Sequence, residues 1–239
     1  MSKLAIVAAL EREVWPLVKK WRVNEREHGG RSFRFFEDGE TVLVCGGIGA
    51  EPARRAAEAV MAIYSPHVVY SVGFAGALEG GLKAGEVFQP AQVIDARDGS
   101  RVNLSAGKGV IVSFGSVATP AQKAKLKESF GAQLVDMEAA GVARAAQARG
   151  VEFAAVKAIS DEFDFVFPPT EQFVDSAGRF QQGRFAAYAA LRPWLWPRVW
   201  TLAMNSNLAS VALCGWLVTT MNKMIACARE QKLEATHRP

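Results

Sequence analysis

The feature that most constrains the fold of this chain is the regular alternation of short apolar runs with longer amphipathic or Ala-rich segments. A short apolar run bounded by turn residues is typical of a buried strand, and the segments between these runs carry the end signals of helices. Strands that alternate with helices build a sheet whose faces are covered by helices. The sequence therefore predicts an α/β fold.

The predicted elements follow one another without a linker or an internal repeat, so we expect one domain over residues 1–239. Residues 31–47 are typical of a β-hairpin with its turn at Asp38-Gly39. The other predicted strands are 3–10, 67–73, 86–96, 109–115, 132–136 and 152–159. The predicted helices are 11–21, 50–64, 119–131 and 138–149, with helical segments from about 170 to the end. The helix over 119–131 has Thr119 at its cap, Pro120 at its first position and Gly131 at its end.

Composition excludes several classes of protein. Half of the residues are hydrophobic and 22% are charged, which predicts a packed globule. The net charge of +4 is mild and no run of Lys and Arg is present, so we expect no nucleic-acid partner. Three scattered cysteines without a CxxC pair, and three histidines that do not cluster, predict neither a disulfide framework nor a metal site. The first residues run straight into charges without a signal peptide, which predicts a cytoplasmic protein.

Four acidic residues follow predicted buried strands. Glu11 and Glu13 come after the first strand, and Glu138 and Asp161 come after two later ones. Gly-rich segments at 46–51 and 73–81 follow two further strands, where we expect loops whose backbone a ligand can approach. Ligands of open α/β sheets bind beyond the carboxyl ends of the strands. The alternative for Glu13 and Glu138 is that each only stabilises a helix N-terminus.

Five stretches in this order resemble the superfamily of purine nucleoside phosphorylases and methylthioadenosine/S-adenosylhomocysteine nucleosidases. They are "AALEREV" (8–14), "GGIGAEPA" (46–53), "VGFAGAL" (72–78), "VDMEAAGVA" (135–143) and "AISD" (158–161). Together they span roughly the first 165 residues. The resemblance implies a three-layer α/β fold with a mixed central sheet, cleavage of an N-glycosidic bond without a cofactor, and a homodimer or higher homo-oligomer.

The resemblance also implies a role for individual residues. Asp161 would protonate or hydrogen-bond N7 of the leaving purine and suits a 6-aminopurine. Glu138 would hold the ribose hydroxyls, and Met137 would pack against the sugar. Glu13 would position or deprotonate the attacking water, with Glu11 as the alternative in the same segment. The remaining expected substrate-binding residues are Gly47, Phe74, Ala75, Gly76, Phe114 and Ser160.

The choice between water and phosphate as nucleophile depends on anion-binding residues. Phe74 stands where a hydroxyl residue commonly follows the first glycine of this segment. Arg54 and Arg55 fall on the predicted helix 50–64, where a solvated face is the simpler interpretation. These features favour water, although backbone N–H groups alone can bind phosphate, so phosphorolysis stays open.

The C-terminal helical segment, about 191–230, is apolar and contains four of the six tryptophans. Arg192, Arg198, Asn205 and Asn207 interrupt its most apolar part, which predicts a poor transmembrane span. Trp and Arg in an apolar helix suit the boundary between water and lipid, which would place the protein peripherally at the inner membrane. A core helix or an oligomer interface is the alternative, and composition favours neither.

This tail, together with the short 96–110 connection and "SVATPAQKAKL" (116–126), resembles the hopanoid-biosynthesis-associated phosphorylases. That resemblance implies that the substrate is adenosylhopane, a lipid nucleoside, and that the products are adenine and ribosylhopane, or its 1-phosphate if phosphate attacks. The alternatives are a methylthioadenosine/S-adenosylhomocysteine nucleosidase with the same site residues, and a nucleoside-binding protein without activity.

Overall fold

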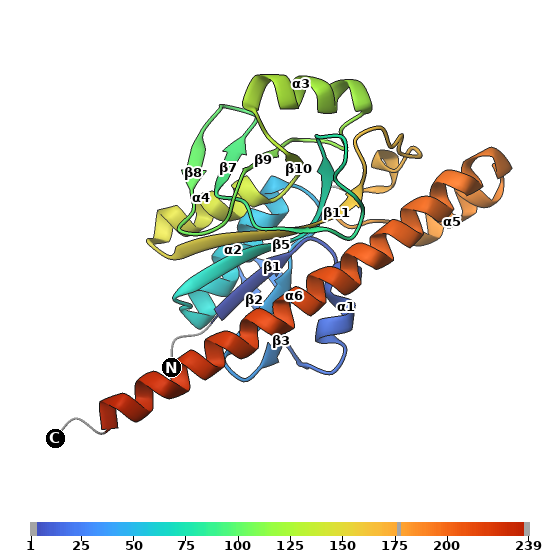
Figure 1. The fold of residues 1–239 in the computed structure, drawn as a ribbon. Coiled ribbons are helices and arrows are strands. Elements are labelled where there is room, and N and C mark those ends of the chain that lie inside the picture. The colour runs from blue at the N-terminus through green and yellow to red at the C-terminus, as the bar shows by residue number, and fades with distance from the viewer. Residues whose placement is uncertain (1–3, 176–177, 237–239) are drawn as a thin grey trace.

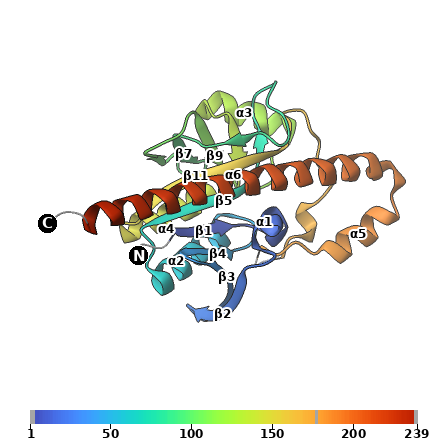
Figure 2. The same cartoon turned by 60° about the horizontal axis from the view of Figure 1, so that its bottom comes forward.

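The computed structural model describes residues 4–175 and 178–236, with side chains described as far as Lys223 except that of Glu171. Figure 1 and Figure 2 show a central sheet between two layers of helices. Helices α2 (Ala50–Tyr64) and α4 (Ala139–Arg149) pack on one face, and α1 (Glu11–Val18) and α6 (Trp196–Thr236) pack on the other. This is the α/β fold that the sequence pattern predicts, with the three layers and mixed sheet that the family resemblance implies.

The sheet contains both parallel and antiparallel pairs. Its strands are β1 Leu4–Ala8, β2 Arg22–His28, β3 Arg31–Asp38, β4 Thr41–Cys45, β5 Val68–Ala77, β6 Val87–Phe88, β7 Gln92–Asp95, β8 Arg101–Asn103, β9 Val110–Ser113, β10 Leu134–Asp136 and β11 Glu152–Asp161. Their order is β2-β3-β4-β1-β5-β10-β9-β7-β8, with β11 paired to β5 and β6. Strands β1, β4, β5 and β11 run parallel, whereas β10 is antiparallel to the end of β5.

Helix boundaries follow the capping signals of the sequence. Helix α3 (Pro120–Phe130) begins after Thr119, whose hydroxyl accepts a hydrogen bond from the Gln122 N–H at 3.3 Å. The Gln122 side chain accepts in return from the Thr119 N–H at 2.9 Å, and Gly131 ends the helix in the left-handed conformation. Leu126 is buried in the cluster that also holds Ile94 of β7, so α3 packs over the β7–β9–β10 part of the sheet.

Helices α2 and α4 pack very closely because the residues between them are small. A Cβ atom added to Gly141 of α4 would lie 2.1 Å from the carbonyl oxygen of Ala50, which begins α2. Glycine in a helix interior costs roughly 1 kcal/mol relative to alanine. Glycine is nevertheless present at position 141, because a side chain there would prevent this close approach of the two backbones.

Four parts of the chain differ from the sequence prediction. The predicted strand 86–96 is two strands, since β6 pairs with β11 whereas β7 pairs with β8 and β9. Residues 73–77 are not a loop, because β5 continues to Ala77 by pairing first with β11 and then with β10. Strands β2 and β8 form in segments for which we expected no strand; each is largely polar and lies at an edge of the sheet, where an apolar run is not required. Helix is not continuous from about 170: a 3₁₀ turn at Glu171–Phe173 and a bridge between Val174 and Phe180 precede α5 (Gln182–Ala190).

Helix α6 has one face in the core and another in solvent. A short 3₁₀ turn, Pro193–Leu195, leads into it, and it then runs across the sheet next to α1 (Figure 1). Among the described residues, its buried apolar side chains contact the core, and they are Ala209, Leu213, Cys214, Leu217 and Met221. By length and composition alone, residues Pro193–Lys223 are apolar enough to cross a membrane, a test that a core helix of a soluble protein also passes. The buried face of α6 packs on β11 and β5 of the sheet.

Candidate active site

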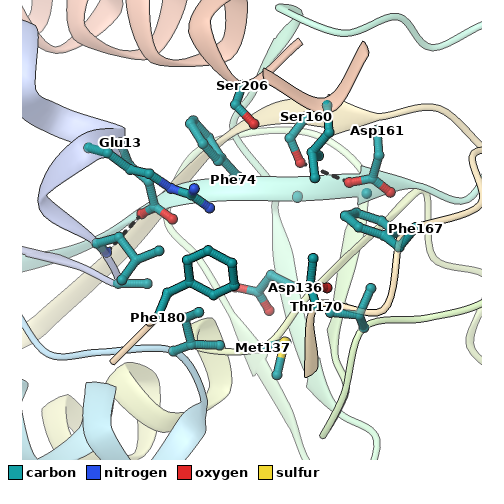
Figure 3. Close-up of a pocket in the computed structure, with 18 of the residues that line it drawn as sticks. Glu13, Phe74, Asp136, Met137, Ser160, Asp161, Phe167, Thr170, Phe180 and Ser206 are labelled. Atoms are coloured by element: carbon teal, nitrogen blue, oxygen red, sulfur yellow. Dashed lines mark hydrogen bonds between the residues drawn. The ribbon is translucent and has the colours of Figure 1, made fainter. Parts of the chain in front are cut away.

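One cavity of about 950 Å³ lies at the carboxyl ends of the parallel strands, between the sheet and α6. Residues that follow or end β1, β4, β5, β10 and β11 all line it. Figure 3 shows Glu13 and Asp161 on opposite sides, with Phe74 and Met137 between them. The convergence of strand ends that the sequence predicts is therefore present.

Glu13 lies in the first turn of α1 and faces the cavity, where its side chain is buried. Its Oε2 atom accepts a hydrogen bond from the Leu10 N–H at 3.4 Å. Burial raises the pKa of Glu13, and the nearby charges of Lys157 and Arg12 oppose this. Gly73 makes room for the carboxylate, since a Cβ there would lie 2.8 Å from Oε2 and its φ of +145° disfavours other residues. Glu13 is thus a carboxylate whose raised pKa suits proton transfer.

Glu138 does not stabilise the N-terminus of α4 through a side-chain cap. Its Oε1 atom accepts from the Gly49 N–H at 2.9 Å, and its Oε2 atom from the Met137 N–H at 3.3 Å. The cap of α4 comes instead from Asp136, whose Oδ2 atom accepts from the Ala139 N–H at 2.9 Å. Glu138 therefore forms no side-chain cap hydrogen bond in α4, and it lines the cavity.

Lys157 of β11 stands among three carboxylates. Its Nζ atom lies 2.8 Å from Oδ2 of Asp136, and Glu138 and Glu13 are close enough to act on its charge. Burial alone would lower the pKa of Lys157, and the carboxylates outweigh burial and raise it. Burial raises the pKa of Glu138 to about 7, with Lys157 opposing and the other two carboxylates adding to the rise. The positive charge of buried Lys157 therefore interacts with all three carboxylates.

Asp161 and Ser160 both line the cavity because β11 is irregular at its end. Ile159 pairs with Ala75, but Asp161 pairs with Gly76, so Ser160 is the extra residue of a bulge. In a regular strand two consecutive side chains would point to opposite faces. Asp161 Oδ1 accepts from the Ser160 hydroxyl at 2.8 Å, and Asp161 Oδ2 lies 2.5 Å from Nζ of Lys123 on α3.

Eight of the ten predicted site residues line the cavity. They are Glu13, Phe74, Ala75, Gly76, Met137, Glu138, Ser160 and Asp161. Gly47 and Phe114 do not: Ile48 and Gly49 are the residues of that segment that line it, and Phe114 packs against the core cluster beside β9.

Glu11, Arg54 and Arg55, which the sequence left open as a base and as phosphate-binding residues, do not line the cavity. Glu11 is directed away from the cavity and pairs with Arg34 at 3.2 Å. Arg54 and Arg55 pair with Glu51 on the surface of α2, as their interpretation as a solvated face predicts.

Sequence reasoning missed the lysines and the contribution of α6. Lys157 is the one charged residue inside an otherwise apolar strand, which is a signal of a buried ion pair. Lys123 carries no such signal, since it is one of several lysines on a short polar helix. Helix α6 lines the cavity with side chains at helical spacing, among them Val199, Leu202, Ala203, Ser206 and Ser210. In the part of the chain that is described, no group of three or more His, Cys, Asp or Glu side chains is arranged so that it could hold a metal ion.

Two buried carboxylates on opposite sides of a cavity, one of them paired with a lysine, can serve a bond cleavage that needs a base at one end and an acid at the other. A third carboxylate between them can accept hydrogen bonds from hydroxyl groups.

Known proteins resemble this chain over most of its length. Aminodeoxyfutalosine nucleosidase of Campylobacter jejuni is 26% identical over an alignment of 207 positions, which covers 69% of this chain and 90% of that one. The structure of futalosine hydrolase of Helicobacter pylori covers 93% of this chain and 98% of its own, with 18% identity and a TM-score of 0.68. That of 5′-methylthioadenosine nucleosidase of Arabidopsis thaliana covers 93% and 95%, with 18% identity and a TM-score of 0.71. The model of the phosphorylase superfamily matches residues 3–110 and 96–187. The chain therefore belongs to the phosphorylase superfamily.

Proposed function

We propose that this protein is an N-ribosyl hydrolase that cleaves the N-glycosidic bond of an adenine nucleoside. The observation that carries the proposal is the placement of Glu13 and Asp161 on opposite sides of one cavity, with Met137 and Glu138 in its lining (Figure 3). The relatives named above are nucleosidases or a hydrolase, which supports the same reaction class.

Each carboxylate has a distinct task in the proposed reaction. Adenine is a poor leaving group as an anion, so Asp161 donates a proton or hydrogen bond to N7 as the bond to C1′ breaks. Glu138 accepts hydrogen bonds from the ribose hydroxyls and stabilises the positive charge that develops on the sugar. Glu13 takes a proton from the water that attacks C1′, for which burial has raised its pKa.

Water is favoured over phosphate by the charges of the cavity. Among the residues that line it, the basic ones are Arg12 and Lys123. Lys123 is paired with Asp161, and the Arg12 guanidinium lies over the ring of Phe180 at 5.4 Å. A phosphate site needs several donors that converge on one place, and these two cations serve other partners.

The substrate we propose is adenosylhopane, whose 5′ substituent is a large triterpenoid. Ligand cavities of proteins are roughly 300–1,000 Å³, and this one, at about 950 Å³, has room for more than a simple nucleoside. With adenine at Asp161 and ribose at Glu138, the 5′ substituent would leave between α1 and α6. Trp15, Pro16, Val199 and Leu202 line that part of the cavity and offer it an apolar surface.

The outer face of α6 supports a peripheral contact with a membrane. Five of its exposed apolar side chains lie three or four residues apart, namely Trp196, Trp200, Met204, Leu208 and Val211, with Trp194 just before the helix. Trp194 and Trp200 are each 71% exposed. The same helix lines the cavity with its neighbouring face, so a lipid nucleoside would pass along α6 from the membrane to the carboxylates. The alternative to be tested is that a second copy of the chain covers this stripe of exposed apolar side chains.

The decisive experiment is to incubate the purified protein with adenosylhopane and with methylthioadenosine, each with and without phosphate, and to measure adenine and the sugar product. Adenine from adenosylhopane without phosphate supports the whole proposal. Faster release from methylthioadenosine would favour a methylthioadenosine/S-adenosylhomocysteine nucleosidase, which the same carboxylates would serve. Strict dependence on phosphate, with a sugar 1-phosphate as product, would favour phosphorolysis. Binding without release of adenine would leave a nucleoside-binding protein.

A further inference from the structure

The contact that the proposed reaction leaves unexplained is the ion pair between Lys123 and Asp161. Lys123 belongs to the first turn of α3, yet only 1% of its surface is exposed, because its side chain enters the wall of the cavity. Its Nζ atom lies 2.5 Å from Asp161 Oδ2 and 2.7 Å from the carbonyl oxygen of Glu162. The two partners of the ammonium are therefore the last residue of β11 and the residue that follows it.

The surroundings of this pair fit closely around it. A Cβ added to Gly76 would lie 2.6 Å from Asp161 Oδ2 and 3.2 Å from Lys123 Nζ, so glycine at this position makes room for both groups. Ser160 donates to the other carboxylate oxygen at 2.8 Å. Capping of α3 by Thr119 fixes the turn from which the lysine extends. A buried ion pair adds little net stability compared with apolar side chains of the same size, so its presence in a cavity points to chemistry.

We propose that Lys123 is a positioning residue for departure of the base: it fixes Asp161 and supplies the positive charge and the proton that Asp161 passes to the purine. This inference rests on the proposed function. A lone carboxylate beside a departing purine anion would repel it, and the ammonium makes the paired groups neutral overall.

The proton balance of this step is simple. The C1′–N9 bond breaks and its electron pair stays with the purine. N7 takes a proton from Asp161, which takes one from the Lys123 ammonium. The attacking water gives its proton to Glu13. After adenine leaves, solvent returns a proton to Lys123 and removes one from Glu13, and the site is restored.

The test compares two leaving groups in the same variant. Lys123→Met should lower kcat for methylthioadenosine by about 10²-fold or more, with a smaller change in KM. The same variant should cleave 4-nitrophenyl ribofuranoside at nearly the rate of the wild type, because nitrophenolate leaves without a proton. Since both rates come from one preparation, any loss of folded protein affects them equally. Lys123→Arg, which keeps the charge, should recover part of the loss.

A second measurement uses methylthioadenosine alone. If Lys123 acts through Asp161, the double variant Lys123→Met/Asp161→Asn should be no slower than Asp161→Asn. Equal losses on both leaving groups, a native kcat of Lys123→Met, or multiplying losses in the double variant would each overturn the inference while the nucleosidase stands. Failure of the wild type to release adenine from any nucleoside would overturn the proposed function, and this inference with it.

Discussion

Nζ of Lys157 lies 2.8 Å from Oδ2 of Asp136, and both side chains are buried where Asp136 lines the cavity. Asp136 also accepts from the Ser113 hydroxyl at 2.6 Å and caps α4, so the pair joins β9, β10, β11 and α4 at one point. The single positive charge of Lys157 is shared with Glu13 and Glu138. With more acidic groups than cations in a buried place, protonation of Glu138 becomes favourable near neutral pH.

Glu138→Gln should make the stability of the protein less dependent on pH. The pKa of Glu138 is raised from 4.5 to about 7 in the folded state, mainly by burial. Its contribution to stability is complete below pH 4.5 and is lost as pH rises through about 7. The difference in free energy of unfolding, variant minus wild type, should therefore increase from about pH 5 to pH 8, by up to about 3 kcal/mol. Urea unfolding at both pH values measures this.

The control for that experiment is Glu128→Gln, which changes an exposed carboxylate of α3. It should follow the wild-type curve at both pH values. An unchanged pH dependence in Glu138→Gln would show that Glu138 does not titrate near neutrality.

Glu13→Gln should abolish release of adenine, while Glu11→Gln should keep it. Glu13 faces the cavity with a pKa raised by burial, and glutamine cannot take a proton from water. Glu11 pairs with Arg34 outside the cavity. Initial rates and adenine binding by calorimetry separate the effects, since binding should persist in Glu13→Gln. An inactive Glu11→Gln beside an active Glu13→Gln would reverse the assignment.

Asp161→Asn should reduce turnover of adenine nucleosides by about 10²-fold or more, because the amide cannot deliver a proton to N7. The wild type should release adenine faster than hypoxanthine from matched nucleosides. Asp164→Asn, which changes an exposed carboxylate three residues further on, is the matched control. Native turnover in Asp161→Asn, or faster release of hypoxanthine by the wild type, would remove Asp161 from the proposed role.

Trp194→Ala with Trp200→Ala should weaken sedimentation of the protein with liposomes. Burial of each exposed large side chain contributes roughly 1.5–3 kcal/mol, which is enough for reversible membrane binding. Trp196 is less suitable for this test, because its indole N–H donates to the Ala189 carbonyl oxygen at 3.0 Å and ties α6 to α5. The same pair should lower activity on adenosylhopane and spare methylthioadenosine.

Val23→Ala, an exposed apolar residue on β2, is the control for the tryptophan pair and should change neither measurement. Equal loss of both activities in the tryptophan pair would show that α6 is needed for the fold of the site. A change of oligomeric state by light scattering, without a change in liposome binding, would assign the stripe to a second copy of the chain.

Gly141→Ala should destabilise the protein by about 2–4 kcal/mol, because the new methyl group would meet the backbone of Ala50 and separate α4 from α2. Gly215→Ala, in the exposed part of α6 where the Cβ meets nothing within 4 Å, should instead stabilise it by up to about 1 kcal/mol. Thermal unfolding of the two variants compares them directly. A stable Gly141→Ala would show that the two helices can separate cheaply.

Local chemistry was sufficient to predict most elements and their ends. The bounds of α2, the capping of α3 and the buried strands follow from apolar runs, Pro and Gly positions and cap residues, because these forces act over a few residues. The convergence of Glu13, Glu138 and Asp161 was also predictable, since the carboxyl ends of parallel strands meet at one edge. Edge strands β2 and β8 escaped prediction because they lack an apolar run.

Only the tertiary structure decided which side chains meet inside the site. The bulge at Ser160, which turns both Ser160 and Asp161 towards the cavity, depends on the pairing of β11 with β5. The pairing of Lys123 with Asp161 joins α3 to β11 across 38 positions of the chain, and nothing within α3 marks Lys123 among its neighbours. The sequence specified the apolar character of α6, but which of its faces lines the cavity and which stays exposed was decided by packing against the sheet. Such contacts depend on long-range geometry, which local residue patterns do not encode.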